Sequence, residues 1–200
     1  MFGRYNKVQR AVLETTLGII IRKELQATSM ALIAKESGVS TGSIYHYFQS
    51  KEEIVNELYR AIVAFNGEYV REGLTQGATL REKFEAGWRR VVDLGLKYPA
   101  GFQFIEQYSF SPYIYDDVRL AAYTGGWCEP MNRLYADAIA RKLFVPMNPK
   151  MMVQMHYGTF VYLLKANLHE IYALDEDSIG EAIRSCWNAV LLPEAAGAQL

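Results

Sequence analysis

The chain has 200 residues and a formal net charge of −1; half of its residues are hydrophobic and 13% are aromatic. This length suits one or two domains with a sizeable core, and the composition excludes an intrinsically disordered chain. No apolar run approaches the roughly 18 residues that a membrane-spanning helix needs, and no apolar stretch of a signal peptide follows the charged start. The two cysteines, Cys128 and Cys186, lack the spacing of a metal site or a disulfide framework. We therefore expect a cytoplasmic protein without metal or cofactor.

The charge is unevenly distributed along the chain. Residues 1–51 hold seven Lys or Arg against three Glu, a balance of +4, whereas residues 52–200 carry a balance of −5. A basic N-terminal part on an acidic body favours contact with nucleic acid through the first part. A solvated helix face explains some of the same asymmetry.

Residues 5–23 form the first predicted helix. Val8, Val12, Thr15 and Ile19 follow helical spacing and place one apolar face inward. We expect this helix to pack behind the two short helices that follow it.

The next predicted helix begins near Met30. The hydroxyl of Thr28 or Ser29 can cap it by accepting a hydrogen bond from a free backbone N–H. Met30 and Ile33 then lie on one buried face, and Gly38 follows the last turn, where a left-handed residue ends a helix at little cost.

A second short helix follows at once. Ser40 or Thr41 can cap it, and Ile44 and Phe48, four residues apart, point inward together with Tyr47 beside them. Two helices joined by a short turn containing Gly form a helix-turn-helix, whose second helix can enter the DNA major groove. The pattern alone is equally compatible with a structural corner in another all-helical protein. The residues that this helix would present outward are Thr41, Gly42, Ser43, Tyr45 and His46.

The stretch IAKESGVSTGSIYHYFQSKEEI closely resembles the DNA-binding signature of the tetracycline-repressor (TetR) family of bacterial transcription regulators. The resemblance covers roughly residues 5–65, and Leu25 stands where many family members have Gly. It implies a helix-turn-helix domain over 1–50, with the motif at about 29–48, and a ligand-binding and dimerisation domain over 51–200. The resemblance and the pattern together predict DNA contacts from Thr28, Ser29, Ser40, Thr41, Gly42, Ser43, Tyr45, His46 and Lys51.

Longer helices fill the rest of the chain. Ser50 and Glu53 form a capping box at the start of a helix that runs to about Glu72. Thr79 opens the next helix, which the sequence YPAG at 98–101 breaks, and a short aromatic segment follows. Further helices are predicted over 115–144, with disturbances at Gly125, Gly126 and Pro130, and over 150–172 and 175–191. The fold class is therefore all-α with about nine helices: an N-terminal three-helix helix-turn-helix domain and a C-terminal helical domain.

Aromatic residues concentrate in the middle helices. Core packing explains each of them singly, but together they favour an apolar cavity for a small, largely hydrophobic ligand. The predicted ligand-binding residues are Trp88, Phe104, Tyr108, Tyr123, Trp127 and Tyr157, with polar contacts from Glu106, Gln107, Asn132, His156 or Asn167.

The resemblance completes the functional hypothesis. It implies a homodimer through helices at about 150–172 and 175–191, which binds a palindromic DNA operator as a repressor and is released by its ligand. Two other classes stay open on the sequence: a ligand-binding or scaffold protein that keeps the helix-turn-helix as structure only, and a small helical enzyme. The enzyme is disfavoured because the sequence offers no catalytic base and nucleophile pair and no phosphate-binding loop.

Overall fold

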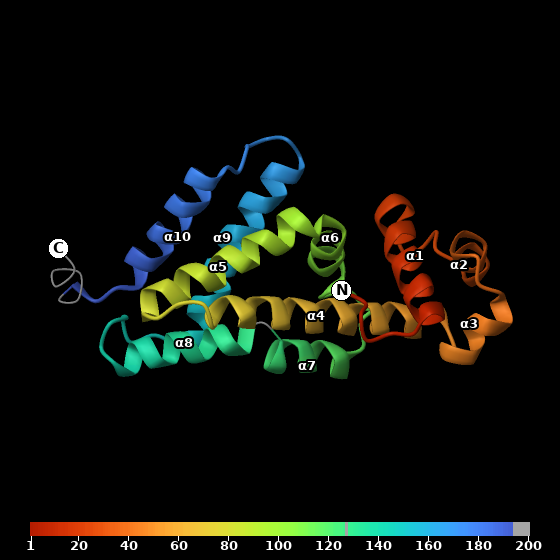
Figure 1. The fold of residues 1–200 in the computed structure, drawn as a ribbon, viewed down its shortest axis with the longest axis horizontal. Coiled ribbons are helices and arrows are strands. Elements are labelled where there is room, and N and C mark those ends of the chain that lie inside the picture. The colour runs from red at the N-terminus through yellow and green to blue at the C-terminus, as the bar shows by residue number, and fades with distance from the viewer. Residues whose placement is uncertain (127, 194–200) are drawn as a thin grey trace. The chain divides into compact units, whose positions relative to one another are not determined.

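The computed structural model describes residues 1–126 and 128–193 (Figure 1). The described residues are helical, with short connections and one isolated bridge between Phe144 and Leu191. No helix among them is long and apolar enough to cross a membrane. The predicted all-α class is confirmed. The ten helices of the described residues are α1 (Lys7–Lys23), α2 (Met30–Ser37), α3 (Thr41–Tyr47), α4 (Lys51–Leu74), α5 (Leu80–Lys97), α6 (Pro99–Tyr108), α7 (Asp116–Gly125), α8 (Cys128–Ala140), α9 (Pro149–Leu168) and α10 (Glu176–Val190).

The chain divides into two compact units. The first contains Met1–Phe65 and Tyr98–Thr124, and thus α1 to α3, the first part of α4, α6 and most of α7. The second contains Asn66–Lys97 and the described residues from Gly125 onward, with α5 and α8 to α10. These units are defined by packing alone, so the assignment of DNA binding to residues 1–50 and of ligand binding and dimerisation to residues 51–200 stays a prediction.

Two stretches differ in detail from the predicted helices. The aromatic segment after residue 98 is itself a helix, α6, because Pro99 fits the first turn, where a missing N–H costs nothing. The single helix predicted over 115–144 is two helices, since α7 ends at Gly125 and α8 begins at Cys128. Pro130 lies in the first turn of α8, the one part of a helix that tolerates it.

Helix α1 supplies the centre of the first unit. Its inward face buries Val12, Leu13, Ile19 and Ile20, as the helical spacing predicts. Helices α2, α3 and α6 all pack against α1, and Figure 1 shows the three N-terminal helices gathered together. The position of the two short helices is thus fixed by a longer one behind them.

Buried hydrogen bonds fasten the connection between α6 and α7 to α4. The fully buried Asn56 donates from Nδ2 to the Tyr113 carbonyl at 2.9 Å and accepts the Tyr115 N–H at 2.8 Å. The Arg119 guanidinium donates to the carbonyls of Ser109 and Ile114 in the same connection. This loop is therefore held in one conformation within the first unit.

The corner between α1 and α2 contains a strained residue. Glu24, which follows the last residue of α1, has φ 64° and ψ 164°, a region that residues other than Gly rarely adopt. The family resemblance places a glycine at the position of Leu25. The backbone conformation that favours glycine occurs one residue earlier, at Glu24. Leu25 instead has ordinary negative φ and buries its side chain in the core.

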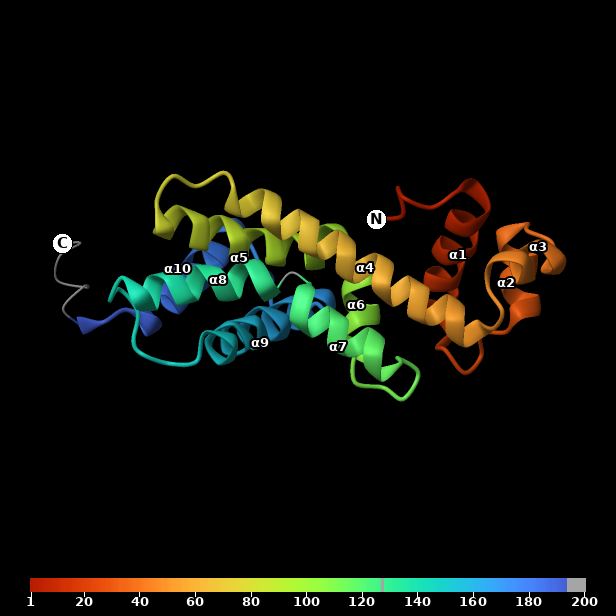
Figure 2. The same ribbon diagram turned by 90° about the horizontal axis from the view of Figure 1, so that it is seen from below.

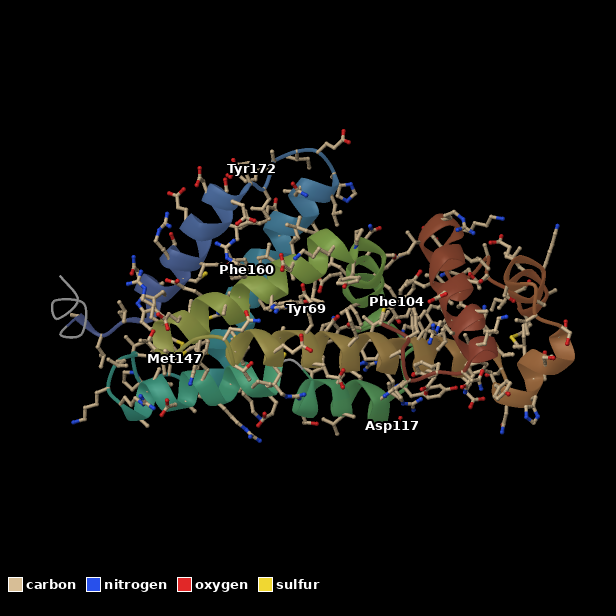
Figure 3. The ribbon with its side chains drawn as sticks, in the orientation of Figure 1. Tyr69, Phe104, Asp117, Met147, Phe160 and Tyr172 are labelled. Carbon is tan, nitrogen blue, oxygen red and sulfur yellow. The ribbon has the colours of Figure 1, made fainter. Side chains whose placement is uncertain are left out.

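An aromatic cluster forms the core of the second unit. Trp88 of α5 stacks on Phe160 of α9 with ring centroids 5.0 Å apart, and Phe84 contacts Trp187 of α10 edge to face. Figure 2 shows α8 and α9 side by side, and both also pack against α5. Phe160, labelled in Figure 3, lies among the side chains between α5 and α9.

A chain of polar groups runs through this aromatic core. The Trp88 Nε1–H donates to the Tyr135 hydroxyl at 2.9 Å, and that hydroxyl lies 2.5 Å from His156 Nδ1. Because the Tyr135 oxygen accepts from Trp88, its own proton is free to point at His156 Nδ1, which must then be unprotonated. Burial lowers the pKa of His156 to about 4, in agreement with a neutral imidazole.

The neutral state of His156 makes the stability of the protein depend on pH. The unfolded imidazole binds a proton below about pH 6.5, but the folded one does so only below about 4, so stability is lost as pH falls between these values. We expect the free energy of unfolding to drop by about 3 kcal/mol across this interval through His156 alone. Urea titrations at several pH values measure it. The variant His156→Gln should lose the pH dependence that His156 contributes and keep that of the carboxylates. A pH profile of the variant identical to that of the wild type would contradict the neutral state of the folded His156.

Candidate nucleic-acid interface

Helix α2 and the turn after it follow the predicted geometry. Ser29 caps α2 by accepting the Leu32 N–H at 3.2 Å. Gly38 ends the helix with φ 69°, the left-handed conformation that glycine adopts without strain. The buried Ile33 faces the core. The turn thus redirects the chain within three residues.

Helix α3 has one buried side and one exposed side. Ser40 caps it by accepting the Ser43 N–H at 3.2 Å, and the two hydroxyls are hydrogen-bonded to each other at 2.8 Å. Ile44 and the following Phe48 are buried, as predicted. The helix carries no acidic side chain, so nothing on it repels a polyanion. The exposed residues of α3 and its cap, called here the α3 surface, are Ser40, Thr41, Gly42, Ser43, Tyr45, His46 and Tyr47.

Tyr47 belongs to this surface, and the prediction that it points inward was wrong. Its side chain is 37% exposed and its ring lies edge-on to His46 at 4.8 Å, beside the 51% exposed Tyr45. The physical reason for the exposure of Tyr47 is that α3 ends at this residue. Phe48 is already extended, with φ −138°, so it turns into the core alone and leaves Tyr47 outside. The short spacing between Phe48 and the next capping residue, Ser50, is the sequence signal for this early end.

The three predicted DNA contacts that lie outside α3 and its cap, Thr28, Ser29 and Lys51, all have partners within the protein. Thr28 is only 1% exposed and its hydroxyl donates to the Glu24 carbonyl at 3.0 Å, so it closes the α1–α2 corner instead of facing outward. The Lys51 ammonium is half-buried and donates to the Leu25 carbonyl at 3.3 Å, which leaves two of its protons free. Ser29 is exposed, but its hydroxyl already serves as the cap of α2.

The side chains of the α3 surface are suited to hydrogen bonding with a partner molecule. Hydroxyls, an imidazole and phenols can donate and accept hydrogen bonds, and the small Thr41, Gly42 and Ser43 allow close approach of a partner to the helix backbone. A Cβ added at Gly42 would meet no atom within 4 Å, so this glycine is not required by internal packing. Among the described residues no group of His, Cys, Asp or Glu could hold a metal ion.

The predicted ligand residues lie in different places. Trp88 and Tyr157 belong to the second unit, whereas Phe104, Tyr108 and Tyr123 belong to the first. Trp127 lies outside the described residues.

The best buried of these residues are already engaged by the protein. Trp88 donates to Tyr135, and Phe104 packs on Tyr108 at 5.3 Å, whose hydroxyl accepts the Leu25 N–H. Tyr123 is partly exposed and contacts the exposed Phe110 at 5.7 Å.

The predicted polar contacts are also dispersed. Glu106 and Gln107 lie on α6 in the first unit, and Gln107 is exposed. In the second unit His156 is bonded to Tyr135, and Asn167 accepts the Leu174 N–H at 2.9 Å. The Asn132 Oδ1 atom is buried without a hydrogen-bond partner among the described residues, so it has unused capacity to accept a hydrogen bond.

A hollow of about 240 Å³ lies between the end of α9 and the first half of α10. Tyr172, labelled in Figure 3, lies at its edge and donates to the Ser178 hydroxyl at 3.0 Å. None of the predicted ligand residues lines this hollow, and it is smaller than a typical ligand pocket of roughly 300–1,000 Å³.

An exposed apolar stripe runs along α9. Met151, Met155, Gly158 and Tyr162 are spaced by four, three and four residues, and all four face outward. Tyr162 is 77% exposed, and a Cβ at Gly158 would meet nothing within 4 Å. A row of this spacing is the seam by which one helix packs on another.

Sequence comparison assigns both parts of the chain to one family. The sequence model of the bacterial regulatory proteins of the tetR family matches residues 12–58, which include the whole helix-turn-helix. The model of the tetracyclin repressor-like C-terminal domain matches residues 79–191, more than half of the chain.

Individual relatives of the chain are also named as transcriptional regulators. The transcriptional repressor KstR2 of Mycobacterium tuberculosis is 30% identical over 115 residues, 58% of this chain and 52% of the relative. The transcriptional regulator BetI of Vibrio campbellii is 40% identical over 65 residues, 32% of this chain and 33% of the relative. The chain thus matches 33% to 52% of the length of these proteins.

Solved structures share the fold. A TetR-family transcription regulator from Marinobacter aquaeolei has a TM-score of 0.85 at 20% identity, covering 96% of this chain and 99% of that chain. The matched proteins are regulators, which confirms the prediction that the chain is not an enzyme. The chain belongs to the tetR family of bacterial regulatory proteins.

Proposed function

We propose that this protein is a cytoplasmic transcriptional repressor that binds a palindromic DNA operator as a homodimer and is released by a small, largely apolar ligand. The observation that carries the proposal is the α3 surface: seven exposed residues without an acid, on a helix whose other side is buried. A helix of this kind in a helix-turn-helix enters the major groove and contacts base edges with its N-terminal residues.

The α3 surface supplies both kinds of contact that DNA recognition needs. Thr41, Gly42 and Ser43 form the first turn, where small side chains bring the helix close to the bases. Tyr45, His46 and Tyr47 lie beyond them and are long enough to reach base edges or phosphates. The proposed set of DNA contacts therefore retains the residues of the α3 surface together with Ser29 and Lys51, and omits the buried Thr28.

The dimer is proposed to form through α9 and α10. The apolar stripe of α9 supports this, because an exposed row of Met, Gly and Tyr costs free energy in water unless another surface covers it. A two-fold contact of this kind would pair one stripe with its own copy. Two copies of α3 could then contact half-sites one helical turn apart, about 34–36 Å.

Relatives favour an apolar effector. The solved structure of KstR2, with a TM-score of 0.70, is named as that of a ketosteroid transcriptional regulator. A Bacillus subtilis relative, 29% identical over 72 residues, is named a fatty acid metabolism regulator. We place the ligand in the C-terminal part of this chain and propose that it acts on DNA affinity through α4, which runs without a break from Lys51 to Leu74. A preference of about 1–3 kcal/mol for the released state would weaken operator binding 5- to 150-fold.

The first prediction concerns direct contact with DNA. Replacing Tyr45 by Ala should weaken binding to an operator selected from random DNA by about 1–3 kcal/mol and leave the melting temperature unchanged, because the side chain is half exposed. Fluorescence anisotropy with labelled DNA measures the affinity. Tyr115→Ala is a matched control, since Tyr115 is 44% exposed in the same unit but belongs to the connection between α6 and α7. Equal affinity of the Tyr45 variant and the wild type would refute the contact.

The second prediction concerns phosphate contact. Lys51→Gln removes the charge but keeps an amide donor for the Leu25 carbonyl, so affinity should fall similarly for all DNA sequences. The slope of log affinity against log salt should become shallower by about one in each half-site. Lys150→Gln, at an exposed lysine of α9, should leave the slope unchanged. An unchanged slope in the Lys51 variant would mean that its ammonium serves the Leu25 carbonyl alone.

The third prediction concerns the dimer. Met155→Glu places a charge in the middle of the α9 stripe and should convert the protein to a monomer in sedimentation velocity at micromolar concentration, because burying an unpaired carboxylate costs several kcal/mol. Leu120→Glu puts the same charge at another exposed apolar position, on α7, and should leave the dimer intact. A dimeric Met155 variant would place the interface elsewhere.

A further inference from the structure

The α1–α2 corner is a strained point in the first unit. Glu24 is one of the three non-glycine residues with positive φ among the described residues, and its ψ of 164° lies in a region that is essentially reserved for glycine. Such a conformation persists only where surrounding contacts hold it. Contacts from neighbouring residues must therefore keep Glu24 in this backbone conformation.

Local hydrogen bonds account for most of the corner. The Glu24 N–H donates to the Ile20 carbonyl at 2.9 Å, and the Glu24 carbonyl accepts from the Thr28 hydroxyl. The Leu25 carbonyl accepts the Thr28 N–H at 3.1 Å. These bonds close the turn on itself, and none of them uses the Leu25 N–H.

The partner of the Leu25 N–H comes from a distant part of the chain. It donates to the hydroxyl of Tyr108, at the end of α6, at 3.3 Å, and the group is buried. The ring of Tyr108 is only 5% exposed and packs on Phe104, so its hydroxyl has a fixed position. Burial raises the pKa of Tyr108, with a smaller contribution from the nearby Glu24 carboxylate, so the hydroxyl is neutral at physiological pH.

The corner sets the direction in which the helix-turn-helix leaves α1. Helix α2 begins at Met30, five residues after Leu25, and α3 follows after the Gly38 turn. Both short helices pack on α1, so a change of backbone angle at Glu24 would tilt them together. The orientation of the α3 surface therefore depends on the conformation of this corner as well as on the packing of α2 and α3 against α1.

We propose that Tyr108 is a positioning residue for DNA recognition: its hydroxyl, by accepting the Leu25 N–H, holds Glu24 in the strained conformation and so fixes the angle between α1 and the α2–α3 pair. This inference rests on the proposed DNA-binding function. It assigns to α6 a direct hydrogen bond to the corner that precedes the helix-turn-helix. This bond is separate from α4, which follows α3 in the chain.

The test combines two substitutions in the full-length protein. Tyr108→Phe keeps the ring and removes only the hydroxyl, whereas Glu24→Gly makes the observed backbone conformation free of steric strain. In the wild-type background, Tyr108→Phe should weaken operator binding about tenfold, because loss of the hydrogen bond lets a relaxed corner outnumber the strained one by about that ratio in the free protein. In the Glu24→Gly background the same substitution should weaken binding less than about threefold, because the corner no longer needs to be held.

Two controls isolate the hydroxyl and the backbone. Tyr113→Phe removes a neighbouring hydroxyl that accepts from the Gln26 side chain at 3.3 Å and not from the backbone, so operator affinity should be unchanged. Glu24→Gln removes the carboxylate but keeps an L-residue, so Tyr108→Phe should retain its full effect in that background. Melting temperatures of all variants identify any general loss of folding, which would lower binding equally in both backgrounds.

The outcomes separate this inference from the proposed function. Operator binding by the wild type, with an equal effect of Tyr108→Phe in the wild-type and Glu24→Gly backgrounds, would overturn the inference and leave the function standing. A wild type that binds no DNA would end the proposed function. In that case amide hydrogen exchange tests whether Tyr108 holds the corner. Faster exchange of the Leu25 and α2 amides in Tyr108→Phe, which Glu24→Gly suppresses, would support the inference. Unchanged exchange in Tyr108→Phe would overturn it.

Discussion

A helix as short as α3 has no stability of its own, and this constraint governs the first unit. Nucleating a helix fixes several residues for one hydrogen bond, so isolated helices below roughly 12–15 residues are marginal in water. The seven residues of α3 are held by burial of Ile44 and Phe48 and by the Ser40 cap. Helix α1 supplies the surface on which this burial happens, and α6 in turn packs against α1.

The local rules of the sequence predicted this part of the fold well. Ser29 and Ser40, each one of two predicted candidates, are the caps of α2 and α3, and Gly38 ends α2 with positive φ. Each of these depends on the chemistry of one residue and its nearest neighbours, which is the information that a single sequence contains. The inward faces of α1, α5 and α10 followed helical spacing for the same reason.

The misplaced features depend on distant contacts. Nothing near Thr28 indicates that its hydroxyl bonds the Glu24 carbonyl, and nothing near Leu25 indicates a partner 83 residues away. Aromatic richness likewise does not distinguish core from ligand site. Trp88 is buried in the core and donates its N–H to Tyr135, and its predicted contact with a ligand stays a prediction. Only the tertiary arrangement decides between these roles, and the sequence alone leaves both possible.

The separation of the two sides of α3 has a consequence for how such a protein changes over evolutionary time. The outward residues from Thr41 to Tyr47, apart from Ile44, add nothing to the hydrophobic interior. If the α3 surface binds DNA as proposed, mutations at these positions alter which operator is bound without lowering the folding free energy. A duplicated gene could therefore acquire a new set of target promoters through a handful of surface changes, while the scaffold beneath them stays constant.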